Sequence, residues 1–172
     1  MSAPGMPTGT LSQKKRALFV KQTMSMVLVC LLIMMVVLAS GHTDGFTLGI
    51  RDSIMIAHSF SGEEFGPAQN MHGATYTVDV DFDSPELAKD SNWVIDIGEA
   101  SDLLSEVLKK YNFKVLNELF PDENTTTEFM CKTIHGDLAE CLRKRKGGAW
   151  SGRMLVKLHE SHKAWAAYAK DV

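Results

Sequence analysis

Two segments in the middle of the chain alternate between apolar and polar residues. The first segment places on one face Ile54, Ile56, His58 and Phe60. The second places on one face His72, Ala74, Tyr76, Val78, Val80 and Phe82. A period of two is typical of antiparallel strands with one buried and one solvated face. The pattern therefore predicts two such strands, joined by a loop at 61–67, with a histidine on the inward face of each.

Shorter patterns predict the start of the first strand and a third strand after the second. Phe46, Leu48 and Ile50 continue the apolar row of the first strand toward the N-terminus. Asp52 interrupts that row, which predicts a bulge or a turn. Residues 92–97 have the composition of a short third strand.

From Gly98 onward, apolar residues recur every three or four positions, which predicts a helix with one buried face. Thr125 and Glu128 have the spacing of a capping box ahead of a second apolar periodicity. The last strand, 154–160, ends its apolar row on Glu160. We therefore expect an α+β domain with a four-stranded antiparallel sheet and two helices packed on one face.

Residues 1–43 have a different character. An uninterrupted apolar run at 26–39 follows a basic flank and leads into Ala39-Ser40-Gly41. This order is typical of an export signal, or of a membrane anchor over residues 24–41. A buried helix of a soluble protein is the alternative, although the run has no polar face. We expect an apolar N-terminal helix in a segment 1–43, a folded domain at 44–172, and a membrane-anchored, exported or organellar protein.

Charge is unevenly distributed along the chain. Four bases and no acid precede Asp44, so the remaining 14 of the 18 bases accompany all 21 acids. A domain with this acidic balance is a poor match for the phosphate backbone of nucleic acids. We expect no nucleic-acid partner.

Three polar residues lie on faces that are otherwise apolar. His58 and His72 look inward, and Glu160 ends the apolar row of the last strand. A carboxylate on a buried side needs hydrogen-bond donors. The edge of a guanidine-like heterocycle would supply such donors. The two histidines are candidate metal ligands, and satisfied core histidines are the alternative.

The order and spacing of five motifs resemble the 6-pyruvoyltetrahydropterin synthase and 6-carboxytetrahydropterin synthase family. The motifs are AHSF at 57–60, HGATY at 72–76, VIDIGEASDLL at 94–104, TTE at 126–128 and HES at 159–161. The resemblance covers about residues 46–168. It implies the T-fold, or tunnelling fold, in which subunits assemble into homo-oligomeric barrels with sites at their interfaces. It also implies a zinc ion bound by three histidines.

Carried over residue by residue, the resemblance assigns His58 and His72 as zinc ligands. It assigns Glu160, Thr126, Thr127 and Glu128 to the binding of a pterin-like small molecule.

The chain also departs from the family pattern. Ala74 stands where the family has a third histidine, no cysteine occurs in 65–70, and Asn112-Phe113 replaces an Asp-His pair. A third metal ligand could come from Glu63, Glu64 or His162, and no catalytic residue is assigned. Two functions stay open. One is a lyase-like enzyme acting on a reduced pterin triphosphate or a related purine-derived heterocycle with a rebuilt catalytic set. The other is a non-catalytic pterin-binding or structural subunit.

Overall fold

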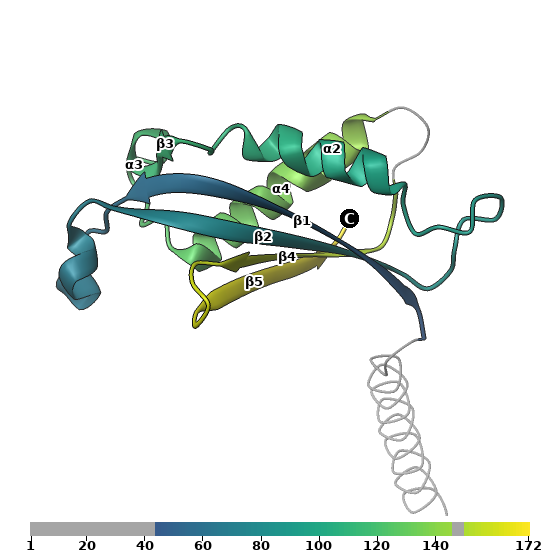
Figure 1. Cartoon of the computed structure of the whole chain (residues 1–172), viewed down its shortest axis with the longest axis horizontal. Coiled ribbons are helices and arrows are strands. Elements are labelled where there is room, and N and C mark those ends of the chain that lie inside the picture. The colour runs from purple at the N-terminus through teal and green to yellow at the C-terminus, as the bar shows by residue number, and fades with distance from the viewer. Residues whose placement is uncertain (1–43, 146–149) are drawn as a thin grey trace, which may run out of the picture. The chain divides into compact units, whose positions relative to one another are not determined.

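The computed structural model describes residues 44–145 and 150–172, which contain both strands and helices (Figure 1). In chain order these are β1 (Phe46–His58), η1 (Glu63–Gln69), β2 (His72–Ser84), α2 (Ile97–Leu108), β3 (Lys114–Val115), α3 (Leu116–Leu119), α4 (Thr127–Lys144), β4 (Arg153–His159) and β5 (Trp165–Asp171). The helix predicted at 24–41 and the whole segment 1–43 lie outside the described residues. Within the described part, no helix has the length and apolar content needed to cross a membrane.

The strands form one five-stranded sheet in the order β3-β1-β2-β4-β5. β1 and β2 are antiparallel and pair without interruption from Phe46 opposite Ser84 to His58 opposite His72. The bulge predicted at Asp52 is therefore wrong, because Asp52 stands directly opposite Val78 in this register. Helices α2 and α4 cover one face of the sheet, as Figure 1 shows.

The predicted four-stranded antiparallel sheet needs two corrections. Residues 92–97 are not a strand, because Asn92 has a left-handed φ of 56° and donates its N–H to the Ala88 carbonyl. Ala88 in turn donates to the Trp93 carbonyl, so this segment turns back on itself. The sheet is also mixed, because the short strand β3 runs parallel to β1.

The sequence does not predict strand β5, because three of its seven residues are alanine and none is β-branched. It pairs with β4 from His159 opposite Trp165 to Arg153 opposite Asp171. Tertiary pairing thus decides the conformation of a segment whose composition does not.

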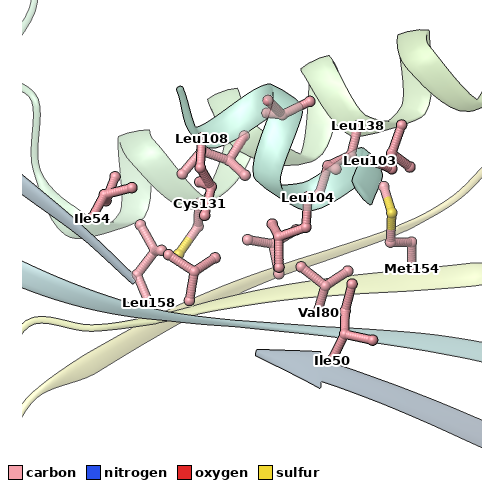
Figure 2. Close-up of a cluster of buried hydrophobic side chains, with 14 of the residues drawn as sticks. Ile50, Ile54, Val80, Leu103, Leu104, Leu108, Cys131, Leu138, Met154 and Leu158 are labelled. Carbon is pink, nitrogen blue, oxygen red and sulfur yellow. The ribbon is translucent and has the colours of Figure 1, made fainter. Parts of the chain in front are cut away.

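The predicted inward faces are confirmed from Ile50 onward as the core between the sheet and the two helices, whereas Phe46 at the start of the first row is exposed. Figure 2 shows Ile50, Ile54 and Val80 of the sheet facing Leu103, Leu104 and Leu108 of α2, with Leu138 of α4. Leu103 and Leu138 are fully buried. Truncating such a leucine to alanine costs about 2–5 kcal/mol in other proteins, because it removes apolar contacts and leaves a cavity.

Helix α4 begins one residue later than the predicted capping box implies. Thr126 is its N-cap, and its hydroxyl accepts the Phe129 N–H at 3.3 Å. Thr125 is fully buried and directs its carbonyl toward His58. Because three threonines stand in a row, the sequence pattern alone does not fix which one caps the helix.

His135 ties α4 to the two last strands. Its Nε2 lies 3.1 Å from the Met154 carbonyl of β4 and 3.3 Å from the Lys170 carbonyl of β5, and its ring meets Tyr168 edge to face. A carbonyl can only accept, so Nε2 is the protonated nitrogen. Burial lowers the pKa of His135 from 6.5, so the folded chain holds this ring neutral.

This arrangement predicts a pH-dependent stability. Burial lowers the pKa of both His135 and His58, so below pH 6.5 the unfolded chain binds more protons than the folded one. The free energy of unfolding should therefore be highest above pH 6.5. It should fall below that pH with a slope of up to about 1.4 kcal/mol per pH unit for each histidine.

Urea unfolding of the wild type and of His135→Gln between pH 8 and pH 5 checks this prediction. Glutamine keeps a donor for the two carbonyls but does not titrate, so the variant should show a shallower dependence on pH. Parallel curves for the two proteins would contradict it.

Candidate metal and ligand site

The two predicted histidines meet where the pairing of β1 and β2 ends. His58 and His72 are directly opposite each other in the register, and their ring centroids are 4.5 Å apart. Phe60 packs edge to face on both rings, at centroid distances of 4.7 Å from His58 and 5.7 Å from His72. The strand register therefore brings together two rings that lie far apart in sequence.

Hydrogen bonds leave the same nitrogen free on each ring. The Nδ1 of His58 lies 3.1 Å from the Thr125 carbonyl, and the Nδ1 of His72 lies 2.8 Å from the Asn70 carbonyl. Since a carbonyl can only accept, each Nδ1 carries a proton, which leaves Nε2 of each ring as the nitrogen that can bind a ligand. Such outer hydrogen bonds orient the histidine ligands of metal sites.

The Nε2 of His58 is a buried polar atom without a hydrogen-bond partner. Burial, together with the nearby ring of His72, lowers the pKa of His58 and keeps its imidazole neutral. A buried acceptor with no partner is costly in a folded protein and calls for an explanation. A metal ion bound at Nε2 would supply one, and the donor set present fits such an ion.

Glu160 joins the two histidines. One ligand atom from each of His58, His72 and Glu160 lies within 4.8 Å of the other two. Two imidazole nitrogens and a carboxylate oxygen are a ligand set found for catalytic zinc. In the described part of the chain, Glu63, Glu64 and His162 belong to no cluster of three such groups, so the third candidate ligand is Glu160.

A cavity of about 240 Å³ lies beside these residues. It is lined by Phe60, Thr126, Thr127, Glu128, Glu160, Ala164, Trp165 and Ala166. The Thr127 hydroxyl donates to the Glu160 carboxylate at 2.8 Å, which links the start of α4 to the end of β4. The structure thus places all four residues assigned to pterin binding on one cavity wall, with Glu160 shared between the cavity and the histidine pair.

Tyr76 is a polar residue of this region that the sequence pattern marks only as part of the core. It is fully buried on the inward face of β2, and its hydroxyl has no hydrogen-bond partner. Burial raises the pKa of Tyr76 to about 12, and the Glu160 charge adds to the shift. The nearby Thr127 hydroxyl offsets part of this rise in pKa, although the two hydroxyls are not in hydrogen-bond geometry. Tyr76 is therefore a neutral donor at physiological pH.

Cys131 lies near the cavity but is not a reactive thiol. Its Sγ donates to the carbonyl of the cavity residue Ala166 at 3.2 Å, and Figure 2 shows its side chain directed into the core near Leu158. Burial raises the pKa of Cys131 to about 11. A thiol that stays protonated is a poor nucleophile, so Cys131 does not replace the cysteine missing from 65–70.

Sequence reasoning assigned no site role to several residues around the histidines and the cavity. Thr125 accepts a hydrogen bond from His58 Nδ1 through its carbonyl, but in the sequence it carries only a helix-capping signal. Phe60 and Trp165 carry no polar signal, although both line the cavity. Lys157 lies 5.0 Å from the centroid of the Trp165 ring, in a cation–π contact that holds the indole.

Comparison with known proteins places the chain in one family. The family model for 6-pyruvoyl tetrahydropterin synthase matches residues 47–171. A protein of Archaeoglobus fulgidus named as a 6-carboxy-5,6,7,8-tetrahydropterin synthase is 30% identical over 93 residues, which are 54% of this chain and 76% of that protein. The chain therefore belongs to the 6-pyruvoyl tetrahydropterin synthase family, as a distant member.

Solved structures agree with this fold. The 6-pyruvoyl tetrahydropterin synthase of Caenorhabditis elegans superposes with a TM-score of 0.63 at 21% identity, covering 74% of this chain and 97% of that one. A Plasmodium vivax 6-pyruvoyltetrahydropterin synthase, solved as a variant of a glutamate described as a catalytic residue, gives 0.57 at 15% identity, covering 75% and 99%. The chain thus has the α+β, T-fold-like architecture of these synthases.

The geometry predicts that a third histidine can be restored. Ala74 lies on the same face of β2 as His72, opposite Ile56 and one residue pair away from the histidines. Ala74→His should tighten zinc binding because it adds an imidazole beside the existing pair. His58→Ala and His72→Ala should each remove most of the metal.

Isothermal titration of the purified chain with zinc measures these affinities, with Thr75→His as a control on the opposite face of β2. Equal zinc affinity in Ala74→His and the wild type would mean that the histidines do not converge on an ion.

Proposed function

We propose that the chain is a metal-dependent lyase that acts on a reduced pterin triphosphate or a related purine-derived heterocycle. The observation that carries the proposal is the meeting of His58, His72 and Glu160 beside a cavity of about 240 Å³. A cavity of this kind, bordered by a few convergent polar groups, is typical of a small-molecule site. Family membership supports the substrate class.

In this proposal, His58 and His72 hold a zinc ion through Nε2, and Glu160 contributes one carboxylate oxygen. A bound zinc ion would stabilise negative charge that develops on a coordinated oxygen of the substrate. The chain's own part is to orient both imidazoles through the carbonyls of Thr125 and Asn70, so that each ring presents Nε2 to the ion.

The second oxygen of Glu160 would anchor the heterocycle. Its Oε2 already accepts the Thr127 hydroxyl, so this oxygen faces donors from the cavity side. A planar ring with N–H groups along one edge would donate to it as well. Phe60 and Trp165 offer flat apolar surfaces to the faces of such a ring. The helix start at Thr126–Glu128 completes the polar wall.

A base for proton abstraction is proposed from the loop between β1 and β2. Glu63 and Glu64 are exposed carboxylates in η1, which connects the strands that carry the two histidines. The glutamate described as catalytic in the Plasmodium vivax protein supports a carboxylate in this role. It would replace the cysteine and the Asp-His pair, neither of which this chain has.

We further propose that the chain works as a homo-oligomer and that residues 24–41 export or anchor it. The alternative function is a pterin-binding or structural subunit without catalysis. The missing cysteine, third histidine and Asp-His pair favour that alternative. Bound zinc and pterin without turnover would support it.

Glu160→Gln separates the roles proposed for this residue. The amide retains the shape of the side chain but loses its charge and is a weak metal ligand. Hydrogen bonds to charged groups contribute about 1.5–3 kcal/mol, so affinity for a fluorescent pterin should fall about 10- to 100-fold in the metal-free chain. Zinc affinity should fall as well.

Fluorescence titration with neopterin and zinc titration provide the two readouts. Glu123→Gln, the same exchange at an exposed position near the start of α4, is the matched control and should change neither. Unchanged neopterin affinity in Glu160→Gln would remove the proposed anchor.

Replacing the proposed base should affect turnover and not binding. Glu63→Gln and Glu64→Gln, made separately, should leave neopterin and zinc affinities unchanged, and one of them should lower the turnover of dihydroneopterin triphosphate at least 100-fold. Product analysis by liquid chromatography measures this loss. Full turnover in both variants would exclude a base from this loop.

A further inference from the structure

One edge of β1 is covered by side-chain amides as well as by a strand. Met55 donates its N–H to the Asn112 side-chain oxygen at 3.0 Å and accepts the Phe113 N–H at 2.7 Å. Two residues later, Ala57 pairs with Val115 of β3. The segment after α2 thus follows the edge of β1 toward the histidine site.

The same pattern continues past the end of the strand. The Asn117 side chain accepts the Ser59 N–H at 2.9 Å and donates to the Ser59 carbonyl at 2.8 Å. The Asn124 side chain accepts the Ser61 N–H at 2.7 Å and donates to the Ser61 carbonyl at 2.9 Å. Each amide offers one acceptor and a donor, as a backbone peptide group does. The two asparagines therefore act as substitutes for a neighbouring strand.

These bonds matter because the pairing of β1 with β2 stops at His58. Beyond that residue, Ser59, Phe60 and Ser61 have no partner in β2. Phe60 donates its N–H to the Ala68 carbonyl at 3.1 Å, which is a contact within the connecting loop. The asparagine side chains therefore supply the bonds that tie the Ser59–Ser61 arm to the rest of the domain.

Asn124 also comes directly before the segment at the start of α4 that contacts His58 and Glu160. The carbonyl of the next residue, Thr125, accepts a hydrogen bond from His58 Nδ1, and the Thr127 hydroxyl donates one to the Glu160 carboxylate. The Asn124–Ser61 bonds therefore hold the arm that carries Phe60 against the segment that orients His58 and Glu160. A shift of Asn124 relative to Ser61 would therefore displace both His58 and Glu160.

We propose that Asn124, assisted by Asn117, is a positioning residue that sets the separation of the ligands His58 and Glu160. This inference rests on the proposed metal site for its main readout. Neither asparagine lines the cavity or belongs to the candidate ligand set. Their role is to fix the arm that follows His58 against the start of α4, so that the imidazole and the carboxylate are aligned before the ion binds.

Asn112 provides a matched control within the same edge. It bonds to β1 at Met55, three residues before His58, where the pairing with β2 is intact on both sides. Asn112→Ala should lower stability by an amount similar to that in Asn117→Ala. It should not move the metal ligands, because the ladder to β2 holds them there.

The test uses the full chain loaded with Co²⁺ as a spectroscopic probe. Asn124→Ala should weaken Co²⁺ binding about 10- to 100-fold, as removal of outer-shell partners does in other metal sites, and should alter the visible absorption of the bound ion. Asn112→Ala should show the wild-type affinity and spectrum. Asn124→Asp keeps the acceptor for the Ser61 N–H but loses the donor, so it serves as a milder variant if Asn124→Ala does not fold.

A second readout does not depend on the metal. Imidazole ¹⁵N spectra of the metal-free chain report whether His58 holds its proton at Nδ1. In the Asn124 variants this signal should change, and in Asn112→Ala it should not. If wild-type protein bound no Co²⁺ while this difference persisted, the metal function would fail and the positioning role would stand. Asn124 variants that match Asn112→Ala in both readouts would overturn the inference.

Discussion

The register between β1 and β2 is the constraint on which the site depends. Side chains alternate along a strand, so a slip of β2 by one residue would turn His72 away from His58 and move the apolar row of β2 into solvent. The apolar residues that come after His72 along β2, from Tyr76 to Phe82, fix the register because each is fully buried. The positions of the histidines result from a core that lies further along the same strands.

The region around the site carries polar groups that the core does not satisfy. His58 Nε2 and the Tyr76 hydroxyl are both buried without partners. A third buried atom without a partner in the described residues, the Trp150 Nε1, lies away from the histidines, where its ring packs edge to face on Phe82. Two of these three unpaired atoms lie near the candidate metal site, where a bound ligand could offset their cost. The His58 and Tyr76 atoms therefore support the candidate site without reference to family membership.

The sequence predicts those parts of the fold that have strong local signals. The alternation in β1 and β2 and the period of α2 give correct inward faces, and with them the approach of His58, His72 and Glu160. Prediction fails where tertiary context decides the structure. The apolar composition at 92–97 indicates a strand because the turn at Asn92 has no such signal, and β5 is held by its pairing with β4. The asparagine contacts are invisible to pattern analysis, since asparagines are common in loops for other reasons.

The two facing histidines also close a loop. Residues 59–71 leave β1 at one ring and return to β2 at the other, so a ligand bound to both rings would act as a cross-link at the mouth of this loop. Closing a loop in advance lowers the entropy lost on ordering it. By the same linkage, whatever orders the loop raises the affinity for the ligand, because each event removes part of the cost of the other. Protection of residues 59–71 from proteolysis should then increase in step with the fraction of histidine pairs that hold a ligand.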